Sequence, residues 1–129
     1  MMKTQGVLQM LNKFKLTIND KVYLSPTITK ELIVNALRNK ETEFILLEPK
    51  EPIHTSLYMQ YAATIEIRFL SAEGKMRHYS YIPENEDEII VFFVDYFEKN
   101  KVPNIENWTD ISASFRPNFF QRLAQKFKH

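Results

Sequence analysis

Residues 57–70 read LYMQYAATIEIRFL, and this stretch decides the fold. Its odd-numbered positions are all apolar or aromatic, and its even-numbered positions are mostly polar. Successive side chains of a β-strand point to opposite faces, whereas a helix would scatter these two sets around its axis. The pattern therefore predicts one strand over residues 57–70, with a buried face and a polar face.

The segment that follows predicts a hairpin. Residues 71–74 read SAEG and suit a turn, and residues 75–82 return as the partner strand. If these four residues form the whole loop, His78 falls on the apolar face. A register shifted by one residue would place His78 beside Glu66 and Arg68 instead, because the side chains of a strand alternate with a period of two.

Short apolar segments nearer the N-terminus predict three more strands, at residues 13–18, 22–24 and 43–48. Between the second and the third, Thr27 or Thr29 is a suitable cap for a helix that runs to about Asn39. The apolar positions of this helix fall on one stripe, which is typical of a helix that packs on a core.

A second helix is predicted to begin at Asn85. Glu88 stands three residues after this N-cap, which is the spacing of a capping box. The acidic residues Glu84, Glu86 and Asp87 surround the helix start, where negative charge complements the helix dipole. This acidic helix start is an ordinary solvated feature, and it is also a candidate contact surface for a basic partner.

The order of elements is β-β-α-β-β-β-α, followed by a loop and a further helix. This order favours an α+β fold in which helices pack on an antiparallel sheet. We expect residues 1–129 to form a single α+β domain, with a sheet of about five strands and two or three helices. Residues 112–129 would be a basic C-terminal helical extension. It carries no acidic residue and four basic residues, which are Arg116, Arg122, Lys126 and Lys128.

The composition excludes several classes of protein. The chain contains no Cys, which excludes a disulfide scaffold, a thiol nucleophile and a Cys-ligated metal. Two Gly are too few for the common phosphate-binding loops, and a net charge of +1 argues against a generally basic nucleic-acid binder. The longest apolar run, residues 89–94, is far below the roughly 20 residues of a membrane span, so we expect a cytoplasmic protein.

Signs of catalysis are scarce. The common hydrolase, kinase and metal-binding motifs do not occur in the sequence. His54 lies in an expected loop, without a carboxylate at strand or helix spacing. We therefore predict no catalytic residue, no metal site and no cofactor, and we favour a protein without enzymatic activity.

The expected register gathers a patch of polar and aromatic side chains on one face of the sheet. The members of this patch are Tyr58, Gln60, Glu66, Arg68, Arg77, Tyr79 and Tyr81. Tyr and Arg are enriched at the centres of protein interfaces, so the patch is a candidate partner-binding surface. The alternative is an ordinary strand surface, on which Glu66 neutralises the two arginines. Single-stranded nucleic acid also stacks on tyrosines, but residues 1–111 carry 13 basic and 16 acidic side chains, which weakens that interpretation.

The basic extension has several possible roles. We expect its Phe-rich stripe to pack on its own domain, and the alternatives are a homodimer seam, docking into a partner and contact with an anionic membrane. Membrane contact is the least expected of these.

Several features follow one another in an order that resembles small bacterial proteins of the toxin-immunity type. They are Met59-Gln60, residues 65–68, Gly74, His78-Tyr79, Phe93, Tyr96 and Trp108. The similarity covers roughly residues 44–111 and leaves the extension outside. It implies a single α+β domain that inhibits a cognate toxin by direct binding, without chemistry of its own.

Three hypotheses for function result. The first is a non-enzymatic protein-binding module of the immunity type, with the sheet patch or the acidic helix start meeting the partner. The second is a small-ligand-binding domain or weak enzyme built on His78, Glu66 and Arg68. The third is an adaptor that uses the basic extension on a membrane or partner.

Overall fold

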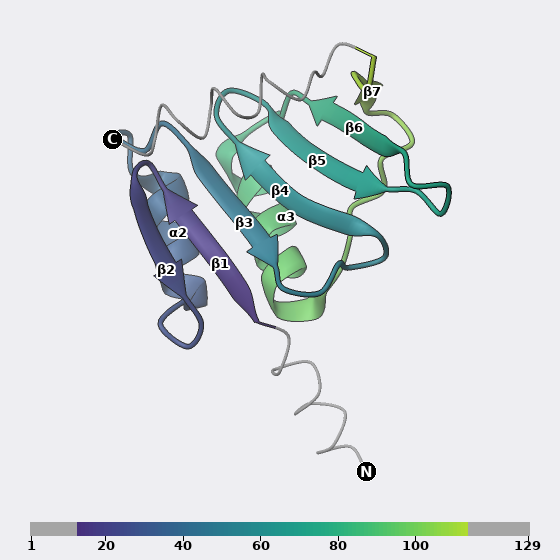
Figure 1. The fold of residues 1–129 in the computed structure, drawn as a ribbon. Helices are drawn as coiled ribbons and strands as arrows, with labels where there is room; N and C mark the ends of the chain where they lie inside the picture. Colours follow the sequence, from purple (N-terminus) through teal and green to yellow (C-terminus); the bar gives the residue numbers. More distant parts are fainter. Residues whose placement is uncertain (1–12, 114–129) are drawn as a thin grey trace.

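The computed structural model describes residues 13–113 as an antiparallel sheet with two helices (Figure 1). The strands are β1 (Phe14–Ile18), β2 (Lys21–Leu24), β3 (Ile45–Pro49), β4 (Ser56–Tyr61), β5 (Ile65–Leu70), β6 (Met76–Tyr81) and β7 (Thr109–Asp110). The helices are α2 (Lys30–Arg38) and α3 (Glu86–Lys99). The strand order across the sheet is β2-β1-β3-β4-β5-β6-β7, and the predicted α+β class is confirmed.

The sheet has seven strands within the described residues, more than the five predicted. Residues 57–70, predicted as one strand, form the two strands β4 and β5, in which Tyr61 lies opposite Ile65. The turn between them spans three residues, so the side chains on both sides of it keep the same alternation. The short strand β7 pairs with β6 and accounts for the remaining difference.

Both predicted helix starts are confirmed. The Thr29 hydroxyl accepts a hydrogen bond from the Leu32 amide at 3.0 Å, and Asn85 Oδ1 accepts one from the Glu88 amide at 2.9 Å. These caps satisfy amide groups that lack a partner within the helix. The helix predicted within residues 112–129 lies outside the described residues, apart from positions 112 and 113.

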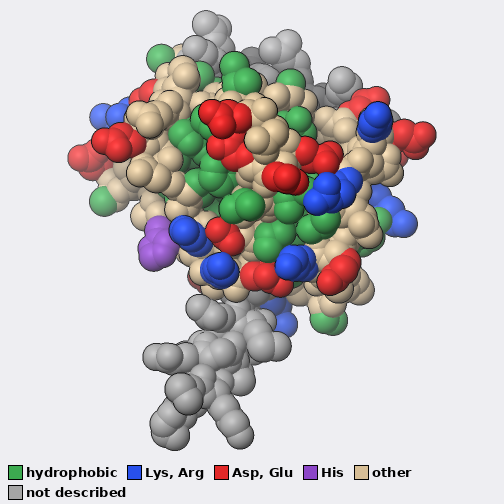
Figure 2. All heavy atoms as spheres, turned by 180° about the vertical axis from the view of Figure 1, so that it is seen from behind, with side chains coloured by type: hydrophobic (Ala, Val, Ile, Leu, Met, Phe, Trp, Pro, Cys, Tyr) green, Lys and Arg blue, Asp and Glu red, His purple; other side chains and the backbone are tan. Residues whose placement is uncertain are grey.

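Both helices pack on one face of the sheet, which we call the inner face; the opposite face is the outer face (Figure 1). Ile65 and Ile67 are fully buried on the inner face, and α3 adds the fully buried Phe93 and Tyr96. The Tyr96 hydroxyl is hydrogen-bonded to Ser56 Oγ at 2.8 Å, which satisfies both polar groups inside this core. The helix side of the molecule shows hydrophobic side chains in its middle, with charged side chains of both signs around them (Figure 2).

Candidate functional site

The hairpin of β5 and β6 adopts the register shifted by one residue. Arg68 lies opposite His78, and Glu66 lies opposite Ser80. Residues directly opposite one another share a face of the sheet, so His78 belongs to the outer face with Glu66 and Arg68. The prediction that His78 joins the apolar face is therefore wrong, and its stated alternative is correct.

The loop of this hairpin explains the shift. The Ser71 amide donates to the Lys75 carbonyl at 2.8 Å, so the loop closes one residue later than predicted. Gly74 takes a φ of 82° inside it, the left-handed conformation that favours glycine. A short turn that ends in such a glycine is a common hairpin connection. As a result, Leu70 lies opposite Met76, whereas a loop of residues 71–74 alone would have placed it opposite Lys75.

The predicted patch is consequently divided between the two faces. Four of its members lie on the outer face: Tyr58, Gln60, Glu66 and Arg68. Its other three members lie on the inner face: Arg77, Tyr79 and Tyr81. The two groups are separated by the thickness of the sheet, so the seven residues do not form one binding surface.

The aromatic residues of the inner group stabilise the packing of α3. The Tyr81 ring stacks on Trp108 with centroids 5.2 Å apart, and its hydroxyl donates to Glu88 Oε2 at 2.7 Å. This hydrogen bond to a carboxylate, together with desolvation, raises the pKa of Tyr81 to about 12. Tyr79 packs edge-on against Phe69. Both tyrosines therefore have a structural role.

On the outer face, four polar side chains form what we call the outer-face cluster: Gln60, Glu66, Arg68 and His78. His78 is only 1% exposed, and its Nε2 lies 2.7 Å from Glu66 Oε1. Arg68 Nε donates to His78 Nδ1 at 3.3 Å, and Gln60 Nε2 donates to Glu66 Oε1 at 3.2 Å. Burial lowers the pKa of Arg68 from its ordinary value. Glu66 and Arg68 are half-buried, although the sequence predicted both to be exposed.

The hydrogen bonds to the His78 ring show which of its two nitrogens carries the hydrogen. An arginine only donates, so Nδ1 is the acceptor, and the ring hydrogen must be on Nε2, which donates to Glu66. The acceptor nitrogen that a general base needs is already occupied, and the ring is closed off from solvent. The cluster therefore suits a role in holding β4, β5 and β6 together better than a role in proton transfer.

Apolar and aromatic side chains surround the outer-face cluster. Phe44, Leu46 and Tyr58 form a small second core on this face, and the Tyr58 ring packs edge-on against His78 at 6.1 Å. Burial raises the pKa of the Tyr58 hydroxyl. The centre of the outer face is thus a buried layer, and the sequence predicted only an exposed polar surface there.

Exposed hydrophobic side chains flank this buried centre on both sides. On the edge strand β2, Val22 is 53% exposed and Leu24 is 60% exposed. Beyond the cluster, Leu70 and Met76 lie opposite one another and are also exposed. We call these four residues the outer rim. Their positions in the register place all four on the outer face.

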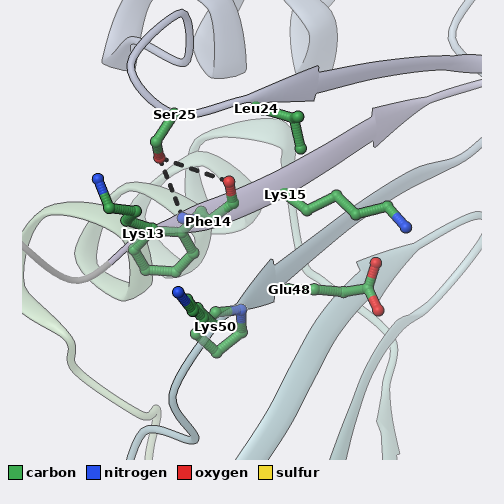
Figure 3. Close-up of a pocket in the computed structure, with 8 residues that line it drawn as sticks. Lys13, Phe14, Lys15, Leu24, Ser25, Glu48 and Lys50 are labelled. Atoms are coloured by element: carbon green, nitrogen blue, oxygen red, sulfur yellow. Dashed lines mark hydrogen bonds between the residues drawn. The ribbon is translucent and has the colours of Figure 1, made fainter.

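A pocket of about 420 Å³ opens beside Leu24, where β1 meets β3 (Figure 3). Phe14, Pro49 and Leu24 give it apolar walls, and the remaining lining residues are Lys13, Lys15, Ser25, Glu48 and Lys50. Lys15 and Glu48 extend side by side at one end, and desolvation raises the pKa of Glu48 while Lys15 opposes that shift (Figure 3). No pattern in the sequence predicts this pocket, because strands that are far apart in the chain form it.

The predicted acidic helix start is exposed at Glu84, Glu86 and Asp87. Arg38 of α2 lies 3.1 Å from Glu86 and 3.8 Å from Asp87, so two of the three carboxylates already face a cation. Glu88 turns inward to Tyr81. The arrangement ties the two helices together and leaves less free negative charge than the sequence suggests.

Within residues 13–113, no group of three or more His, Cys, Asp or Glu side chains is placed to hold a metal ion. Neither helix of this part of the chain is long and apolar enough to cross a membrane. His54 is exposed in a tight turn, as expected of a loop residue. Comparison with protein-family models, with curated proteins and with solved structures finds no match for the chain.

Proposed function

We propose that the protein is a non-enzymatic protein-binding module of the immunity type, which neutralises a protein partner such as a cognate toxin by direct contact. The observation that carries this proposal is the outer rim. Val22, Leu24, Leu70 and Met76 expose hydrophobic side chains on the face of the sheet opposite α2 and α3. Exposed apolar groups on one face are typical of interaction surfaces.

The position of β2 supports the same function. It is the edge strand of the sheet, and a partner strand can add to such an edge through main-chain hydrogen bonds. The pocket beside Leu24 could then receive an apolar side chain of the partner, while Lys13, Lys15 and Lys50 at the pocket favour an acidic neighbour.

The enzymatic alternative has less support. His78, Glu66 and Arg68 lie together as that hypothesis requires, but they occupy one another's hydrogen-bonding groups and His78 is buried. The adaptor alternative depends on the extension, nearly all of which lies outside the described residues. The outer rim remains the best-supported contact surface.

The test uses the full chain and a toxin candidate encoded beside it. The affinity of wild type is compared by calorimetry with that of Val22→Glu/Leu24→Glu and Leu70→Glu/Met76→Glu. We expect at least one pair to weaken binding by about tenfold or more, because a buried charge disrupts an apolar contact. A variant that binds more weakly should also fail to neutralise the toxin in growing cells.

Val91→Glu is the matched control, because Val91 is 52% exposed but lies on α3. This variant should bind like wild type. Circular dichroism of every variant confirms the fold. If both rim pairs neutralise the toxin as wild type does, the proposed function of this face is wrong.

A further inference from the structure

The outer face is buried at its centre although both helices pack on the other face. Leu46 is 8% exposed, Tyr58 is 5% exposed and His78 is 1% exposed, and the Tyr58 ring packs edge-on against His78. Val22 and Met76, on the same face, are about half exposed. The burial is therefore confined to the centre of the face, over β3 to β6.

Residues 13–113 place no helix over this region. A single layer of strands leaves the outward side of its own side chains accessible, so a large aromatic ring is closed off only when something lies on it. The centre of the outer face therefore needs a covering segment.

The described chain ends beside this region. The Ile111 amide donates to the His78 carbonyl at 2.9 Å, and Ser112 Oγ accepts from the His78 amide at 2.8 Å. Ala113 is the last described residue, so the next sixteen residues begin next to the outer-face cluster. Neighbouring strands lie about 4.8 Å apart, so β3 is roughly 14 Å from β6, and sixteen residues span about 24 Å even when fully helical.

The composition of residues 114–129 suits such a cover. The segment contains five large apolar side chains: Phe115, Phe119, Phe120, Leu123 and Phe127. Its four basic residues have no acidic counterpart within it, whereas residues 1–111 carry three more acidic than basic side chains. Apolar complementarity and opposite charge both favour contact between the segment and the rest of its own chain.

We propose that residues 114–129 dock on the centre of the outer face of their own chain, with their aromatic side chains against Phe44, Leu46 and Tyr58. The segment closes the outer-face cluster off from solvent and leaves the outer rim accessible. This inference does not depend on the proposed function, since no external partner takes part in it.

The absence of Cys from the chain allows a direct test by thiol labelling. Leu46→Cys reports on the outer face, and Leu47→Cys reports on the inner face, where Leu47 is fully buried. Each is made in the full chain with the native segment and with Phe119→Ser/Phe120→Ser/Leu123→Ser. The measured quantity is the ratio of the Leu46→Cys labelling rate to the Leu47→Cys rate.

We expect the altered segment to raise this ratio by about tenfold or more, since only the outer face loses its cover. Val22→Cys, exposed on the same face, should label rapidly with either segment. An unchanged ratio overturns the proposal, including the case in which both sites open because the whole fold is loosened. Leu46→Cys labelling as fast as Val22→Cys with the native segment overturns it as well.

Sedimentation velocity at the labelling concentration identifies the source of the cover. A monomer with a protected Leu46→Cys supports docking within one chain. A dimer in which Leu46→Cys becomes reactive on dilution assigns the cover to a second copy and overturns the proposal.

Discussion

The inner and outer faces of the sheet are both buried over β3 to β6, but they are buried by different chemistry. The inner face joins Ile65 and Ile67 to Phe93 with very few polar groups between them. At the centre of the outer face, His78 and Glu66 stand among aromatic rings and depend on each other for hydrogen bonds. The inner face is therefore stabilised by apolar area and close packing, whereas the outer face also depends on the hydrogen bonds of its buried polar groups.

The largest expected effect tests the inner face. Phe93→Ala should lower the free energy of unfolding by about 3–5 kcal/mol, because Phe93 is fully buried and its loss leaves a cavity. Denaturant titration followed by circular dichroism measures this change. Val91→Ala, two residues away on the exposed side of α3, should change stability by less than about 0.5 kcal/mol. Equal effects of the two variants would contradict the assignment of the inner face.

An intermediate effect tests the pairing on the outer face. Glu66→Ala should cost about 1.5–3 kcal/mol, because it leaves the buried Nε2 hydrogen of His78 without its acceptor. Glu66→Gln keeps an acceptor oxygen of the same reach and should recover much of this loss. The same denaturant titration compares the two. If Glu66→Gln is as destabilising as Glu66→Ala, the hydrogen bond is not what stabilises this face.

The smallest expected effect on stability comes from the titration of Tyr81, which lies between the sheet and α3. The pKa of Tyr81 is raised to about 12 in the folded protein, against about 10 for an unfolded tyrosine. Folding therefore favours the protonated phenol, and this contribution to stability is complete below about pH 10 and is lost as the pH rises towards 12. Near neutral pH both states hold the phenol proton, so Tyr81 should not make the free energy of unfolding depend on pH there.

Glu88→Gln should lower the pKa of Tyr81 towards its ordinary value, because the neutral amide no longer favours the protonated phenol as a carboxylate does. Ultraviolet titration of the phenolate, compared between wild type and this variant, measures the change. Tyr81→Phe identifies the contribution of this residue to the titration. Identical alkaline titrations of wild type and Glu88→Gln would contradict the assigned hydrogen bond.

Features that depend on neighbouring residues were predictable from the sequence. The starts of both helices are set by Thr29 and Asn85, whose side chains bond amides three residues later. The burial of Ile65 and Ile67 follows from alternation alone. The turn between β4 and β5 escaped prediction because its three residues leave that alternation unbroken.

Features that depend on the length of a turn or on distant strands were not predictable. One extra residue in the loop closed by Ser71 and Lys75 moved His78 to the other face and divided the predicted patch. The pocket beside Leu24 requires Lys15 to lie opposite Glu48. These two residues are separated in the sequence by β2 and α2. Alternation shows which residues share a face within one strand, but it does not show how two strands are aligned.

The strand order also has a consequence for how the chain folds. From β3 to β6 each strand pairs with the next one along the chain, so these contacts close short loops. The pairing of β1 with β3 must instead close a loop that contains β2 and α2. Because local pairings form at a lower entropic cost, we expect β3 to β6 to assemble first and the seam between β1 and β3 to form after them. The amide hydrogens of the same seam, which has the pocket of Figure 3 along it, should then exchange with solvent before those that pair β3 to β6 with one another.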